Sequence, residues 1–323
     1  MTSNDIRLYR VRGTHYKCAR DIGIACRELI KKRIENDRLY LTPMFNFVRT
    51  IDGLKLHQGF IEIIRKTFPW YWDEILGLAD GSEIPLEQLL VLNFENETQT
   101  AYRLYEAEQM NHQQEDEESG AKGCSTVLIN RLDTNTLSLV HNEDNTAGLY
   151  DTGYLIEADI KSSPYDNGSR HSPNERFIAY CYAGVIPGIA FGANMHGLLV
   201  SGTICVALNY LNHFNHYERS DGSIVEREPL LWSRYRARRA LEIGEIHTVK
   251  DALYLLGDRV DEKYPIFFIG GTTEINLATL CTAHFNFHTR QLSIYRNNPK
   301  DNSEPQLIFN LDDLLKNEFI TNI

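Results

Sequence analysis

The sequence predicts a layered α+β fold. Up to Arg103, apolar residues recur at three- and four-residue spacing, which is typical of amphipathic helices. After Gly123 the chain changes to short β-branched segments separated by turn residues, which is typical of antiparallel strands. Across the 323 residues, 42% are hydrophobic and 24% are charged, as in ordinary globular proteins. This composition excludes a wholly disordered chain.

The first part of the chain is predicted to be helical. An amphipathic helix is expected at 14–38, with Thr14 as its N-cap. Further helices are expected at 54–68, 70–79 and 85–104, and Pro85 suits the first turn of the last one. The stretch 106–122 has no apolar periodicity and carries an acidic run, so it is expected to form a solvated surface loop.

A hairpin is predicted directly after this loop, from strands at 125–129 and 137–140 around the turn residues 133–136. A turn centred on Thr134 places the partner of Cys124 near Asp144, within one or two residues. The remaining expected elements are strands at 152–160, 177–183, 189–194, 197–204, 277–285 and 290–296, helices at 230–243 and 248–257, and a short helix at 311–316.

Charge and apolar patterning exclude several classes of protein. With 33 Lys+Arg against 44 Asp+Glu the net charge is −11, which disfavours nucleic acid as a partner. No apolar run approaches the roughly 18 residues of a membrane span. Residues 1–9 are polar and lack the apolar centre of a signal peptide, so a cytoplasmic location is expected. The six cysteines are scattered, without the spacing of a disulfide framework.

Two basic or metal-like patterns have ordinary explanations. His196, His213 and His216 lack a cysteine or carboxylate at ligand spacing, so neither a metal nor a cofactor is expected. The arginines at 234–239 lie on a predicted helix and are expected to form a solvated face with one structural arginine. Cys124 is different, because the hairpin would place it against the polar run 141–145. That placement fits either an ordinary hairpin end or a reactive thiol.

The sequence around Cys124 resembles a known family. Gly123-Cys124-Ser125-Thr126, followed by Asn142-Glu143-Asp144, is similar to the nucleophile region of the acyl-CoA:6-aminopenicillanate (isopenicillin N) acyltransferase family. This family is peptidase family C45 of the N-terminal-nucleophile (Ntn) hydrolases, and it includes β-alanyl-amine conjugate hydrolases. Other segments resemble the family in the same order, at 12–16, 89–93, 182–187, 192–198, 213–216 and 233–236.

The resemblance implies a single Ntn-hydrolase domain over 1–323. Its fold would be a four-layer αββα sandwich, with two antiparallel sheets between helical layers. The precursor would cut itself between Gly123 and Cys124. The α chain, 1–123, and the β chain, 124–323, would then stay together as a heterodimer, with higher oligomers allowed.

The resemblance also implies the chemistry of the mature site. Cys124 would be the nucleophile, and its freed α-amino group, with an ordinary pKa of roughly 7.7–8.0, would accept the thiol proton. Asp144 would support that pair, and Asn215 would stabilise the oxyanion. Arg234 or Arg236 would help to hold the site. Only fifteen residues separate Gly197 from His213, fewer than in the family, so Asn209 or Asn212 is an alternative oxyanion donor.

The expected activity is therefore that of a self-processing cysteine amidohydrolase. Its substrates would be small N-acyl amine or amino-acid conjugates, hydrolysed through an acyl-enzyme on Cys124. One alternative is an N-acyltransferase that uses acyl-CoA as co-substrate. The other is a catalytically silent homologue that serves as a binding protein, which the short 197–213 region keeps open.

Overall fold

The computed structural model describes residues 5–110, 123–165, 168, 170–201, 210–213, 231–270, 276–301 and 304–316. The chain divides into two compact units, and each unit is assembled from separate stretches of sequence. Unit 1 combines Met1–Ile6, Gly120–Tyr150 and Leu199–Leu315, and unit 2 combines Arg7–Ser119, Asp151–Leu198 and Lys316–Ile323. Each unit therefore contains residues from both sides of the predicted cleavage point.

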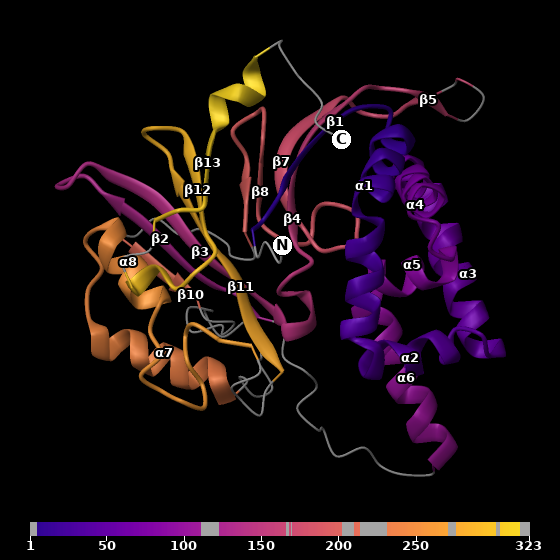
Figure 1. Ribbon diagram of the computed structural model, residues 1–323, viewed down its shortest axis with the longest axis horizontal. Helices are drawn as coiled ribbons and strands as arrows, with labels where there is room; N and C mark the ends of the chain where they lie inside the picture. Colours follow the sequence, from indigo (N-terminus) through magenta and orange to yellow (C-terminus); the bar gives the residue numbers. More distant parts are fainter. Residues whose placement is uncertain are drawn as a thin grey trace. The chain divides into compact units, whose positions relative to one another are not determined.

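Unit 2 is built around helix α1 (His15–Asn36). The side chain of Thr14 accepts a hydrogen bond from the amide of Lys17, which is the predicted N-cap. Figure 1 shows α1 beside α4, and the two helices make extensive contact. The other helices of this unit are α2 (Arg38–Phe47), α3 (Ile51–Thr67), α4 (Pro69–Ser82), α5 (Leu86–Asn93) and α6 (Glu95–Met110).

Glycines allow α1 and α4 to approach closely. A methyl group on Gly77 would strike the backbone oxygen of Tyr16, and one on Gly81 would strike the backbone oxygen of Arg20. Because backbone atoms cannot move aside as a flexible side chain can, these two positions require glycine.

The sheet of unit 2 joins the start of the chain to its middle. Strand β1 (Leu8–Gly13) pairs in parallel with β4 (Tyr154–Ile160), with Leu8 opposite Leu155. On its other side β4 pairs antiparallel with β7 (Glu175–Cys181), which pairs with β8 (Gly192–Asn194). Every residue of β4 is buried, as expected for a central strand.

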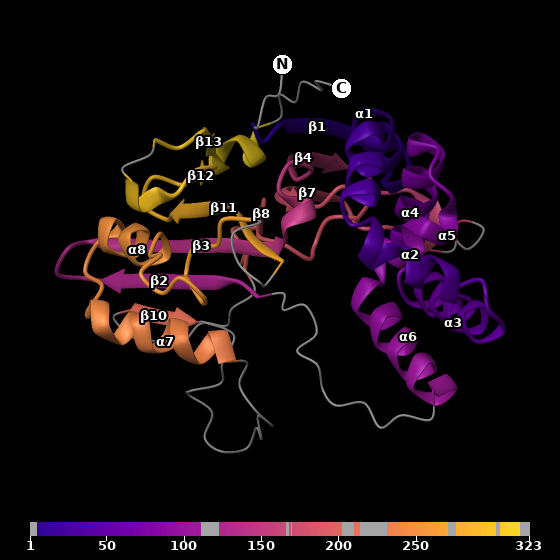
Figure 2. The same ribbon diagram turned by 60° about the horizontal axis from the view of Figure 1, so that its bottom comes forward.

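Unit 1 contains a six-stranded sheet in the order β10-β2-β3-β11-β12-β13. Figure 2 shows β2 and β3 as neighbouring long strands of this sheet. All the pairings in this sheet are antiparallel. The strands are β2 (Ser125–Arg131), β3 (Thr136–Thr146), β10 (Tyr210–His213), β11 (Leu277–Asn286), β12 (Gln291–Tyr295) and β13 (Leu307–Asn310).

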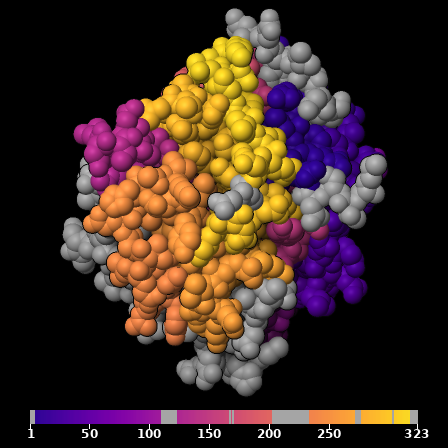
Figure 3. Space-filling view, turned by 60° about the vertical axis from the view of Figure 1, so that its left-hand side comes forward, coloured from indigo at the N-terminus to yellow at the C-terminus, as the bar shows by residue number. Residues whose placement is uncertain are grey.

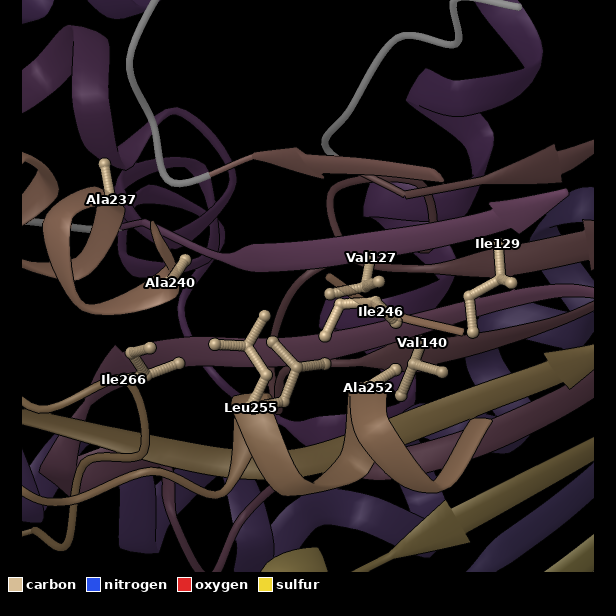
Figure 4. Close-up of a cluster of buried hydrophobic side chains, with 10 residues drawn as sticks. Val127, Ile129, Val140, Ala237, Ala240, Ile246, Ala252, Leu255 and Ile266 are labelled. Carbon is tan, nitrogen blue, oxygen red and sulfur yellow. The ribbon is translucent and has the colours of Figure 1, made fainter. Parts of the chain in front are cut away.

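Two helices, α7 (Leu231–Ile243) and α8 (Val249–Leu256), cover one face of this sheet. Figure 4 shows the apolar side chains that fill the space between these helices and the sheet. Because side chains alternate along a strand, odd-numbered residues of β2 and even-numbered residues of β3 point toward these helices. The cluster consists of Val127, Ile129, Val140, Ala237, Ala240, Ile246, Ala252, Leu255, Leu256 and Ile266.

A buried carboxylate ties α7 to the segment after β12. Asp258 accepts hydrogen bonds from Arg239 Nε at 2.9 Å and from Lys300 Nζ at 2.7 Å. Figure 3 shows the corresponding surface, where the orange α7–α8 segment adjoins the yellow C-terminal segment. The contact holds two sequence-distant parts of unit 1 together.

The fold class is confirmed as α+β, with a sheet and helices in each unit. Several elements were not expected, among them β1, α2, β10 and β13. The helix predicted at 85–104 is two helices, because the chain breaks at Phe94, whose ring stacks on Phe60. The loop predicted from Glu106 starts later, since α6 continues to Met110, and 111–122 lie outside the described residues.

Several described elements are only two to five residues long. The helix predicted at 311–316 is a 3-10 turn, and the strand predicted at 197–204 is seen only as two residues, with 202–204 outside the described part of the chain. These elements are β5 (Pro164–Tyr165), β6 (Arg170–His171), β9 (Leu199–Val200), and the 3-10 turns Ala147–Leu149, Pro299–Asp301 and Leu311–Leu315.

Candidate active site

Cys124 lies immediately before β2, at the end of the predicted hairpin, and it is half-buried. Its thiol donates a hydrogen bond to Glu143 on β3, with 3.5 Å between Sγ and Oε1. Gly123, the residue on the other side of the predicted scissile bond, is also half-buried. The structure therefore places a carboxylate within reach of the predicted nucleophile.

The carboxylate that the thiol contacts is one residue from the expected position, within the predicted range of one or two residues. Ser125 pairs with Asn142 and Thr126 pairs with His141, so the same register continues to Cys124 opposite Glu143. The expected partner, Asp144, is one residue further along. The turn occupies 132–135 and ends at Asn135, whose φ of 48° is left-handed, so its centre precedes Thr134. A one-residue shift of register exchanges the two faces of a strand.

Glu143 belongs to a row of buried polar side chains on the same face of the sheet. Its other oxygen, Oε2, lies 3.2 Å from His141 Nε2, and His141 Nδ1 lies 2.8 Å from Thr126 Oγ1. His141, Glu143 and Thr126 are all buried. The carboxylate that contacts the thiol is thus held in place by a histidine, which is held in turn by a hydroxyl.

Asp144 points to the opposite face, toward α7. It accepts hydrogen bonds from Thr279 Oγ1 at 2.7 Å and from Arg236 Nη1 at 3.2 Å. Arg236 Nη1 also donates to Ser125 Oγ at 3.1 Å. Arg236 is buried, whereas Arg234 is exposed, so the geometry selects Arg236 as the arginine next to the site.

Burial dominates the protonation of these groups. It raises the pKa of the Cys124 thiol well above its usual range, and the charges of Glu143 and Asp144 act in the same direction. Burial also raises the pKa of Asp144 to about 7, although Arg236 and the Thr279 hydroxyl oppose that rise. The uncleaved chain therefore holds Cys124 mainly as the neutral thiol at neutral pH.

Only one of the three candidate oxyanion donors, Asn212, lies in the part of the chain that the structure describes. Asn215 and its alternative Asn209 lie outside the described residues. Asn212 belongs to β10, where its backbone pairs with Val127 of β2. Of the histidines considered for a metal, His196 is exposed and His216 lies outside the described residues.

Sequence reasoning missed Glu143 and His141 as site residues. Both belong to the polar run at 141–145, but the turn centred on Thr134 predicted Asp144 as the partner of Cys124. Their spacing of two residues was the available signal, since residues i and i+2 of a strand share a face. Among the described residues, Cys124, His141 and Glu143 also form a group able to hold a metal ion, with ligand atoms all within 4.8 Å of one another.

Comparison with known proteins adds to this geometry. Residues 131–208 match the family model described as acyl-coenzyme A:6-aminopenicillanic acid acyl-transferase. The chain is also similar to the beta-alanyl-dopamine/carcinine hydrolase of Drosophila melanogaster, with 27% identity over 190 residues. That similarity covers 59% of this chain and 46% of the relative, so the chain spans about half the length of the curated relative.

The chain is thus similar to this acyltransferase family over part of its length. The matched segment includes His141, Glu143 and Asp144, and Cys124 lies seven residues before it. Among the helices that the structure describes, none is both long and apolar enough to cross a bilayer.

Proposed function

We propose that this protein is a self-processing cysteine amidohydrolase of the acyltransferase family that it resembles. The observation that carries the proposal is the contact between the Cys124 thiol and the buried Glu143 carboxylate at 3.5 Å. A thiol needs a proton acceptor to become a nucleophile, and Glu143 is the nearest one. His141 orients that acceptor through the contact at Oε2.

Self-cleavage would start with attack of Cys124 Sγ on the Gly123 carbonyl carbon. The thiol proton passes to Glu143, the S–C bond forms, and the C–N bond to Cys124 breaks as its nitrogen takes up that proton. Water then hydrolyses the resulting thioester, which frees the Gly123 carboxylate and regenerates the thiol. Glu143 is therefore restored at the end, as general acid–base catalysis requires.

In the mature enzyme, Cys124 would carry its own base. The freed α-amino group has an ordinary pKa of roughly 7.7–8.0 and can accept the thiol proton. Cys124 would attack an amide carbonyl to form an acyl-enzyme, which water resolves. Asp144 acts from the far face of the sheet as a positioning residue, since it fixes Arg236, which in turn bonds Ser125 next to the nucleophile. Asn215 remains the proposed oxyanion donor.

The substrates we propose are small N-acyl amine or amino-acid conjugates. The support is the similarity to a relative whose name describes hydrolysis of β-alanyl conjugates. The family name supports a second candidate, transfer of an acyl group from acyl-CoA to an amine. Assays of amide conjugates with and without acyl-CoA and an acceptor amine distinguish the two, because a strict requirement for acyl-CoA contradicts hydrolysis.

The two fragments, 1–123 and 124–323, are proposed to stay together as a heterodimer in the cytoplasm. The support for association is unit 2, where β1 from the first fragment pairs with β4 from the second. Arg33 from the first fragment also donates to the Ala183 carbonyl from the second at 2.8 Å.

The decisive experiment follows the size of the purified chain on a denaturing gel. Wild-type protein should give two fragments, and mass spectrometry should place the new ends at Gly123 and Cys124. Cys124→Ala should stay whole, because it has no nucleophile. Cys281→Ala is the matched control, since Cys281 is a buried cysteine opposite Glu143 in the neighbouring strand. A wild-type chain that remains intact after prolonged incubation contradicts self-processing.

A further inference from the structure

We propose that the uncleaved chain binds one zinc ion through Cys124, His141 and Glu143, and that the bound zinc blocks self-cleavage. The blocking role rests on the function proposed above, whereas the binding site does not. The three ligand atoms lie within 4.8 Å of one another on one face of the unit 1 sheet. They come from the start of β2 and from alternate residues of β3, so rigid strands hold them.

The donor set favours zinc. A thiolate, an imidazole and a carboxylate are the three ligand types that Zn²⁺ takes in proteins. Magnesium and calcium prefer oxygen ligands only, and the cysteine and histidine exclude them here. Three protein ligands leave the fourth tetrahedral position to water, which needs no further residue.

The present contacts require little rearrangement to bind the ion. Glu143 Oε1 already lies 3.5 Å from Cys124 Sγ, and the other oxygen, Oε2, lies 3.2 Å from His141 Nε2. These separations are close to the roughly 3.3–3.5 Å between adjacent ligand atoms in a tetrahedron with a zinc–sulfur bond of about 2.3 Å and zinc–nitrogen and zinc–oxygen bonds of about 2.0 Å.

The second ring nitrogen of His141 is already occupied by a suitable partner. Nδ1 lies 2.8 Å from Thr126 Oγ1, and a hydroxyl can donate or accept. The Nδ1–H tautomer, which donates to Thr126, leaves the Nε2 lone pair free for zinc. An orienting partner of this kind is usual for histidine ligands and typically accounts for a 10- to 100-fold difference in affinity.

Zinc binding and cleavage compete for the same atom. Formation of the S–Zn bond releases the thiol proton to solvent, and the sulfur lone pair then serves the metal instead of the Gly123 carbonyl. Glu143 is engaged at the same time, so the proton acceptor is also withheld. Zinc would thus hold the precursor in its uncut form until the ion is removed.

Binding is tested with zinc chloride and the purified full-length chain, first treated with a chelator. Isothermal titration should give one site per chain in the wild type, and Co²⁺ should give the near-ultraviolet absorption band of a thiolate ligand. Cys124→Ala and His141→Gln should each weaken binding by at least 100-fold, and Thr126→Val by about tenfold. Cys281→Ala should bind as wild type does. Equal binding by wild type and Cys124→Ala, or loss of binding in Cys281→Ala, overturns the site.

Blocking is tested separately, by following fragment formation on a denaturing gel. A stoichiometric excess of zinc should stop cleavage, and chelator should restore it. If zinc binds but cleavage proceeds unchanged, the blocking role is wrong. If the chain binds zinc through Cys124 yet never cleaves even with chelator, the proposed function fails while the zinc site stands.

Discussion

The Cys124 thiol and the Glu143 carboxylate are in hydrogen-bond contact, with 3.5 Å between Sγ and Oε1. The thiol has the high pKa of a buried group among carboxylates, so it is a poor nucleophile until its proton has been taken. A neighbouring acceptor therefore matters more in the uncut chain than it would after the proposed cleavage, which would make an α-amino group available.

Glu143→Gln tests the acceptor role. The amide keeps the shape of the side chain but cannot take up a proton at neutral pH, so self-cleavage should slow by about 100-fold or more. The rate is read from fragment bands over time. Glu262→Gln, at an exposed position of the same unit, is the control and should cleave at the wild-type rate. Equal rates for both variants would remove Glu143 from the reaction.

The same Glu143→Gln variant should make Cys124 more reactive toward iodoacetamide. Burial is the main cause of the raised thiol pKa and remains, but the charge of Glu143 is the next cause and disappears. The thiol pKa should therefore fall, and alkylation at pH 8 should become faster. Mass spectrometry of the uncut chain measures the label. Slower cleavage together with slower alkylation would instead indicate a disrupted site.

Arg236→Met should destabilise unit 1 by about 3–5 kcal/mol, because it removes the cation that pairs with the buried Asp144. Arg234→Met should change stability by less than about 0.5 kcal/mol, since Arg234 is exposed. Urea denaturation of uncut chains in the Cys124→Ala background measures both. The double variant Arg236→Met, Asp144→Leu should recover part of the loss, and equal stability of the single and double variants would contradict a buried ion pair.

His284 should make the fold sensitive to acid. Burial lowers its pKa from 6.5 to about 4, so between these values the unfolded chain binds a proton that the folded chain does not. The contribution of His284 to the free energy of unfolding does not change with pH above 6.5. As the pH falls toward 4, this contribution decreases by about 2–3 kcal/mol. His284→Gln should lose correspondingly less between pH 7 and pH 4 in thermal unfolding. His288→Gln, at an exposed position, should follow the wild type.

Gly81→Ala should destabilise unit 2 by about 1–3 kcal/mol, because the new methyl group meets the backbone of α1. The matched control is Gly59→Ala in α3, where a methyl group meets nothing within 4 Å. That change should stabilise the helix by about 0.5–1 kcal/mol. Opposite signs in urea denaturation are the expected result, and a neutral Gly81→Ala would show that the helices can move apart.

Local signals were sufficient for part of the fold. Thr14 marked the start of α1, and the turn at 133–136 located the β2–β3 hairpin. Long-range contacts determined what was missed. β1 becomes a strand through its parallel pairing with β4, almost 150 residues away in sequence, and α2 contains Pro43, which sequence rules treat as a helix stop.

In the candidate site, too, the sequence predicted some residues, and the others depended on the three-dimensional structure. The resemblance located Cys124, but one residue of hairpin register decided between Glu143 and Asp144 as its partner. The turn spans 132–135 and includes the left-handed Asn135, but the sequence did not indicate its exact position because asparagine suits several turn positions. The choice between Arg234 and Arg236 required knowing which side of α7 faces the sheet, and the apolar cluster around Ala237 and Ala240 provides that.

The pairing of β1 with β4 has a consequence for how the protein regains its structure. The two strands belong to one chain before the proposed cut and to two chains after it, with the same hydrogen bonds in both. Uncut Cys124→Ala protein should therefore refold from urea at a rate independent of its concentration. Processed protein should refold more slowly on dilution, because two separate molecules must first meet. Self-cleavage would thus convert the folding of one chain into the assembly of two chains.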